Sequence, residues 1–91
     1  MNAETIVSQG QQHVETAADG EVVLMHVESG RFFTLTGTGQ RVWELIAEPI
    51  SIDALAERLA GEYDVEPETC RNDVLEICRQ LEASALIDVS A

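Results

Sequence analysis

The chain has 91 residues, of which 45% are hydrophobic, so length and composition predict one globular domain and exclude a disordered acidic tail. Seventeen acidic residues against five arginines give a formal net charge of −12. This charge argues against binding to nucleic acid or to anionic membranes and favours a basic or neutral partner. No apolar run approaches the roughly 20 residues that span a bilayer, and the N-terminus lacks signal-peptide features, so we expect a cytoplasmic protein.

The residue types that carry catalysis or bind metals are sparse in this sequence. Cys70 and Cys78 are expected to be free thiols, because eight residues of helix would separate them by about 12 Å and a disulfide needs Cα atoms within about 7 Å. His13 and His26 are too few for a metal site. Nucleophile and phosphate-binding motifs are also missing. We therefore expect no catalytic residue, no metal and no cofactor.

The first part of the chain has the pattern of strands. Residues 1–10 are expected to be weakly structured or to form a frayed strand. After them, turn signals around Gly20 and Gly30 separate three segments, which are residues 13–17, 21–27 and 31–35. Consecutive strands with tight turns predict an antiparallel meander.

The second part of the chain has helical periodicity. We expect a helix over 40–47 with Thr38 as its N-cap and with Trp43 on the flank of its apolar face. A second helix follows Ser51, and a third begins near Pro67. The predicted fold class is α+β, in which a three-stranded antiparallel sheet is followed by three helices within a single domain over 11–91.

Two surfaces of this predicted fold could bind a peptide. The third strand lacks an obvious partner on one edge, and an open edge can accept an extended peptide as an added strand. On the third helix, one flank could form the floor of a groove, and its residues are Arg71, Leu75, Cys78 and Glu82. The alternative is that Leu75 is an ordinary exposed leucine.

Several short motifs share an order and spacing that resemble one family. They are Gly30-Arg31-Phe32-Phe33-Thr34-Leu35-Thr36, Thr38-Gly39 through Val42-Trp43-Glu44-Leu45-Ile46, Leu55-Ala56 with Leu59, and Asp73-Val74 through Leu81 to Leu86-Ile87. Together they resemble the PqqD-like family, the RiPP recognition elements, over about residues 12–88. The chain departs from the family pattern at Thr36, Cys78 and Ala85, where asparagine, leucine and glycine are usual.

The resemblance implies a winged helix-turn-helix-like fold and a non-catalytic role. Family members bind the leader region of a ribosomally made precursor peptide and present it to a leader peptidase or another modifying enzyme. The leader would add to the third strand at Arg31, Phe32, Phe33, Thr34 and Leu35, and would lie in the groove beside the third helix. Among subfamilies, the chain is most similar to the stand-alone proteins of lasso-peptide clusters or of related clusters of unassigned product.

Other hypotheses remain open at this point. The fold class also permits a winged-helix DNA-binding regulator, although the acidic charge opposes it. A small enzyme is another alternative, without a constellation of residues to support it. The open strand edge could also pair with a second copy of the chain to form a homodimer.

Overall fold

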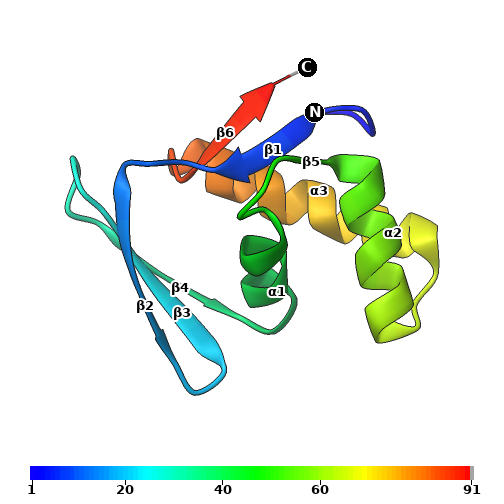
Figure 1. The fold of residues 1–91 in the computed structure, drawn as a ribbon, viewed down its shortest axis with the longest axis horizontal. Coiled ribbons are helices and arrows are strands. Elements are labelled where there is room, and N and C mark those ends of the chain that lie inside the picture. The colour runs from blue at the N-terminus through cyan, green and yellow to red at the C-terminus, as the bar shows by residue number, and fades with distance from the viewer. Residues whose placement is uncertain (91) are drawn as a thin grey trace.

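The computed structural model of the chain describes residues 1–90, which form two three-stranded antiparallel sheets and three helices (Figure 1). In chain order, the elements are β1 (Ile6–Gln9), β2 (His13–Ala18), β3 (Glu21–His26), β4 (Phe32–Thr36), α1 (Gly37–Leu45), β5 (Ile50–Ser51), α2 (Ile52–Tyr63), α3 (Pro67–Ala83) and β6 (Ile87–Ser90). The mixed α+β class and the three helices are confirmed. Within residues 1–90, none of these helices is long and apolar enough to cross a membrane.

The predicted meander is present as the sheet β2-β3-β4. Its register places Val22 opposite Leu35 and Leu24 opposite Phe33, so these four side chains share one face of the sheet. Val22 and Leu24 are buried in the core. The turns before β3 and β4 use Gly20 and Gly30, whose φ angles of 76° and 71° are easier for glycine than for other residues.

A second sheet, in the order β5-β1-β6, corrects two expectations from the sequence. Residues 1–10 are not weakly structured, because β1 pairs with strands on both sides and the side chain of Val7 is fully buried. The backbone N–H of Gly10 also donates to the carbonyl of Leu86 at 2.9 Å. As Figure 1 shows, β1 and β6 come from opposite ends of the chain and β5 comes from its middle, so the fold is more than one sheet followed by helices.

The first helix begins three residues earlier than the sequence predicts. Gly37, with a φ of 57°, turns the chain out of β4, and α1 starts at that residue with Thr36 as its N-cap. Thr38 therefore lies inside the helix and is not its N-cap. The second helix agrees with the prediction, since Ser51 Oγ accepts a hydrogen bond from the backbone N–H of Ala54 at 3.1 Å.

Trp43 is part of the core, which corrects its expected place on the flank of α1. Its side chain is only 1% exposed. The ring of His13 packs edge-on against it with centroids 5.0 Å apart, and the indole N–H donates to Glu15 Oε2 at 3.3 Å. Both partners belong to β2, so this tryptophan holds the meander against α1.

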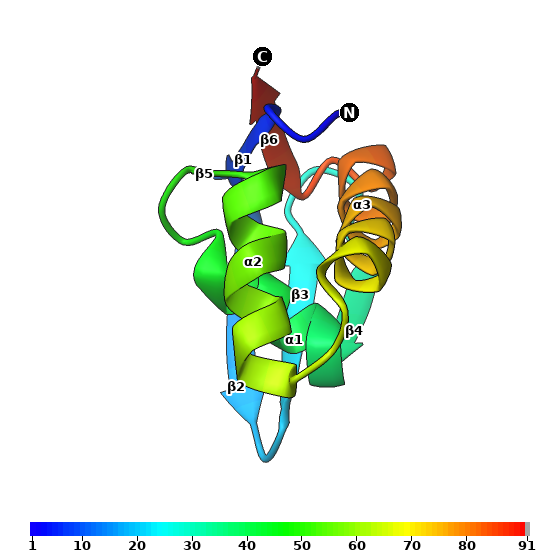
Figure 2. The ribbon, with the colours of Figure 1, turned by 90° about the vertical axis from the view of Figure 1, so that its right-hand side faces the viewer.

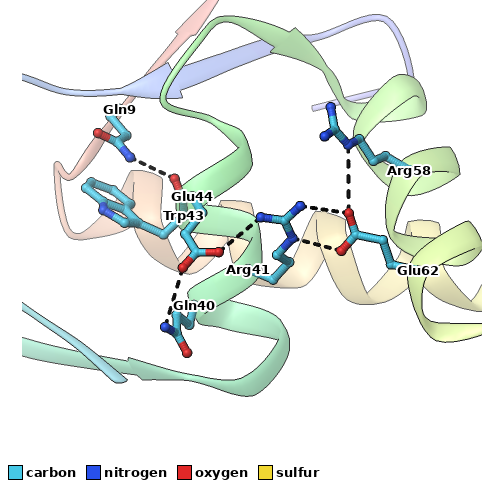
Figure 3. Close-up of polar contacts among 7 residues, drawn as sticks. All are labelled: Gln9, Gln40, Arg41, Trp43, Glu44, Arg58 and Glu62. Atoms are coloured by element: carbon cyan, nitrogen blue, oxygen red, sulfur yellow. Dashed lines mark hydrogen bonds and ion pairs between the residues drawn. The ribbon is translucent and has the colours of Figure 1, made fainter. Parts of the chain in front are cut away.

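Polar contacts link α1 to β1 and to α2 (Figure 3). The amide of Gln9 donates to the carbonyl of Trp43 at 2.7 Å. Arg41 donates to both carboxylate oxygens of Glu62 at 2.8 Å and to Glu44 at 3.1 Å. The hydrogen bonds from Arg41 lower the pKa of Glu62. These contacts fix α1, which follows β4 directly, between the meander and α2.

Candidate peptide-binding site

The outer edge of β4 is the first component of the candidate site. The backbone N–H of His26 donates to the carbonyl of Arg31 at 2.9 Å. Because hydrogen-bonding direction alternates along an antiparallel strand, Phe33 and Leu35 direct their backbone groups toward β3. The N–H and C=O groups of Phe32 and Thr34 therefore point away from the sheet, along an edge that no other strand of residues 1–90 pairs.

The side chains of β4 divide between the two faces of the meander. Phe33 and Leu35 are half-buried and pack against the core, whereas Phe32 is 70% exposed on the outer face together with Thr34. Arg31 precedes the strand, and its guanidinium carbon lies 5.8 Å from the centroid of the Phe33 ring. The five residues expected at the docking edge thus form one continuous segment, in which alternate side chains point to opposite faces of the meander.

A hollow near the C-terminal end of β4 is the second component. It has a volume of about 280 Å³, and its lining residues are Thr38, Asp73, Glu76, Ile77 and Gln80. Thr38 comes from α1, two residues after β4 ends, and the other four come from α3. Figure 2 shows α3 and β4 on the same side of the molecule. An extended peptide on the edge of β4 would run toward this hollow.

The groove residues expected from the sequence do not line this hollow. They form one flank of α3, and their names are Arg71, Leu75, Cys78 and Glu82. At about 100° per residue, the centre of this flank lies about 180° around the helix from the centre of the four α3 residues that line the hollow. Arg71 donates to Asp53 of α2 at 2.8 Å. Cys78 is fully buried, so its expected place on a binding surface is wrong. Leu75 is half-buried against the core cluster.

Comparison with known proteins places these two components within one family. The sequence pattern of the family described as Coenzyme PQQ synthesis protein D (PqqD) matches residues 21–87, which extend from β3 to β6. The chain belongs to the PqqD family. The matched region includes both β4 and α3, so the PqqD resemblance covers both components of the candidate site. A search of curated proteins found no match.

Two solved structures are similar to this PqqD-family chain over nearly its whole length. TbiB1 in complex with the TbiA(beta) leader peptide is 28% identical, with a TM-score of 0.84 over 92% of this chain and 98% of that one. Lasso peptide synthetase B1 complexed with the leader peptide is 20% identical, with a TM-score of 0.80 over 90% of this chain and 96% of that one. The second structure supports the fold alone.

The two cysteines of this PqqD-family chain are buried and free. Burial raises the pKa of the Cys78 thiol to about 11. Burial, and secondarily the negative charge of Asp73, also raises the pKa of Cys70. Because the thiolate is the reactive form of cysteine, both side chains are suited to packing in the core rather than to nucleophilic chemistry.

Four residues of the site escape prediction from the sequence, namely Asp73, Glu76, Ile77 and Gln80. Helical periodicity places Asp73 and Gln80 on a polar flank, Glu76 in solvent and Ile77 in the core. The usable signal is their spacing of i, i+3, i+4 and i+7, which places an apolar residue and three polar residues in one stripe of α3.

Proposed function

We propose that the chain is a non-catalytic recognition protein that binds the leader region of a ribosomally made precursor peptide. The observation that carries this proposal is the open edge of β4, which ends near a hollow lined by α3, in a PqqD-family chain. A structure 28% identical to this chain is that of TbiB1 in complex with the TbiA(beta) leader peptide. The sequence motifs favour lasso-peptide biosynthesis as the pathway.

The proposed mode of binding is β-strand addition. Phe32 and Thr34 would supply main-chain donors and acceptors to the peptide, because their backbone groups face outward from β4. Alternate peptide side chains would point toward α3, where Ile77 offers an apolar contact. Arg31 would lie at the entrance to this edge, with its guanidinium over Phe33.

The bound leader would bring the rest of the precursor to a second protein, a leader peptidase or another modifying enzyme of the pathway. In this role the chain holds the peptide and performs no chemistry on it, which agrees with its two buried, protonated thiols. We place this exchange in the cytoplasm, where free cysteines persist. Pairing of two copies through β4 would compete with the leader for the same edge.

The winged helix-turn-helix description suits α2 and α3 as the helix pair and the β3–β4 hairpin as the wing. DNA binding, the alternative function for such a fold, is not favoured by the arginines. Arg71, on α3, is paired with Asp53, and Arg41 and Arg58 are paired with Glu62. A phosphate backbone would therefore meet an acidic surface whose few cations are largely engaged.

Backbone-amide NMR tests the proposal directly. The labelled chain would be titrated with the leader of its own precursor peptide and with the TbiA(beta) leader. We expect the largest shifts in β4 and on the hollow-facing side of α3, with smaller changes in β1 and β6. Failure of its own leader to shift any amide at high concentration would refute the function, and shifts centred on β2 would refute the binding edge.

A further inference from the structure

We propose that the hollow near the end of β4 binds a lysine or arginine side chain of the leader peptide. Asp73 and Glu76 would face the cation, and Ile77 would contact its aliphatic stem. This inference rests on the proposed function and adds to it a chemical requirement on the peptide.

The lining of the hollow has the composition that such a side chain needs. Lysine and arginine combine an apolar stem with a cationic end, and they are most stable where the stem contacts apolar surface and the charge meets acceptors. Ile77 is half-buried and packs against the core, so it provides an apolar floor. Thr38 and Gln80 add polar groups at the margins.

The two carboxylates of the hollow have no cation beside them, as is the case for most acidic side chains of residues 1–90. Asp53, Glu44 and Glu62 each form an ion pair with an arginine. Within residues 1–90, neither Asp73 nor Glu76 has a hydrogen-bond or ion-pair partner among the side-chain contacts. Their charge is therefore available to a ligand.

The location of the carboxylates connects them with the peptide edge. Thr38 lies two residues beyond the end of β4, and it lines the hollow together with Asp73 and Glu76. A strand added to β4 would carry a side chain toward the hollow at a fixed register, because main-chain pairing sets the position of every residue along the edge. An apolar side chain there would leave these carboxylates without a partner, and an acidic one would add a repelling negative charge.

A displayed library of random 15-residue peptides, selected for binding to the full chain, tests the inference whatever the sequence of the leader. The native chain would be compared with the double variant Asp73→Asn/Glu76→Gln. The matched control is Glu68→Gln/Glu82→Gln, which removes the same charge from exposed positions of α3 outside the hollow.

We expect native selections to enrich lysine or arginine at one position of a common motif. Replacing that residue by glutamine in a synthetic peptide should weaken binding to the native chain about 5- to 10-fold, as expected for loss of a charge-assisted contact. The same replacement should change binding to the Asp73→Asn/Glu76→Gln chain less than about 2-fold. The Glu68→Gln/Glu82→Gln chain should behave like the native one.

The outcomes separate this inference from the function on which it rests. Peptides that bind to β4 without a preferred basic position would overturn the hollow's assignment and leave leader recognition intact. Equal effects of the two double variants would also overturn it, since they would reveal a response to total charge. A library that yields no binding peptide would overturn the proposed function together with the inference.

Discussion

At the scale of single residues, Ala85 occupies a backbone conformation that favours glycine. Its φ is 58°, and it directly follows the last turn of α3. The N–H of Ala85 donates to Glu82 and that of Leu86 donates to Leu81, which is the hydrogen-bond pattern of a Schellman motif. We expect Ala85→Gly to raise the free energy of unfolding by about 0.5 to 1 kcal/mol, measured by urea denaturation followed by Trp43 fluorescence.

The control for this substitution is Ala83→Gly, two residues earlier and still within α3. Glycine should destabilise that position by up to about 1 kcal/mol, because it increases the freedom of the unfolded chain without relieving a left-handed conformation. A loss of stability in both variants would show that the αL conformation of Ala85 is not strained in solution.

Cys78 makes the stability of the fold dependent on alkaline pH. Burial raises its pKa from 9.0 to about 11, so the native state retains a proton that the unfolded state loses. The contribution of this group to the free energy of unfolding is complete below pH 9, and about 2 to 3 kcal/mol is lost as the pH rises from 9 to 11. Urea titrations across this range in the native chain and in Cys78→Ala measure the loss. If the free energy of unfolding falls equally with pH in the two proteins, the loss does not come from the raised pKa of Cys78.

At the scale of elements, the direction of the backbone groups in β4 gives a test of strand addition. The N–H of Thr34 points to the open edge, so Thr34→Pro removes a donor to the peptide without removing a bond to β3. We expect leader affinity, measured by calorimetry, to fall about 2- to 10-fold, which corresponds to one hydrogen bond.

Ala17→Pro is the matched control on the opposite edge of the same sheet. The N–H of Val27 donates to the carbonyl of Gln12, and the alternation along β2 then directs the N–H of Ala17 away from β3. This variant should keep native affinity. If the proline in β2 weakens binding as much as the proline in β4, the peptide does not use β4 selectively.

Helix α3 offers a comparison between its two flanks. Ile77 lines the hollow and Leu75 does not, although both side chains are half-buried against the core. Alanine at either position should cost about 1 to 2 kcal/mol of stability, less than in a fully buried site. Leader affinity should fall about 5- to 10-fold in Ile77→Ala and less than about 2-fold in Leu75→Ala. The reverse order would restore the groove predicted from the sequence.

The same helix shows how far the sequence alone can lead. Its periodicity identifies the buried stripe, including Val74 and Leu81, because burial imposes a spacing that can be read along the chain. The groove cannot be located in this way. Periodicity tells which side of a helix faces the core, whereas the neighbour of each flank depends on where α1 and α2 lie in three dimensions.

Strand β1 escapes prediction for a related reason. Four residues with one buried side chain, Val7, give almost no periodic signal. The partners of β1 are β5 and β6, which lie about 40 and 80 residues further along the chain. The meander is predictable because its strands are consecutive and are separated by turns with glycine.

At the scale of the whole molecule, the charge of −12 is distributed over a chain whose arginines are mostly paired with carboxylates. The resulting negative field extends about 10 Å from the surface at moderate ionic strength. A basic leader would be attracted by this field before it reaches β4. The field and the hollow should therefore affect different steps of binding.

We expect the association rate constant of a basic leader to fall about 10-fold between about 20 mM and 500 mM NaCl, while its dissociation rate constant changes less than about 3-fold. Long-range attraction acts on the encounter, whereas contacts made in the complex determine its lifetime. By the same reasoning, Asp73→Asn/Glu76→Gln should accelerate dissociation, and Glu68→Gln/Glu82→Gln should only slow association slightly. Stopped-flow fluorescence with a labelled leader measures both constants, and a salt effect confined to dissociation would place the relevant charges in the hollow alone.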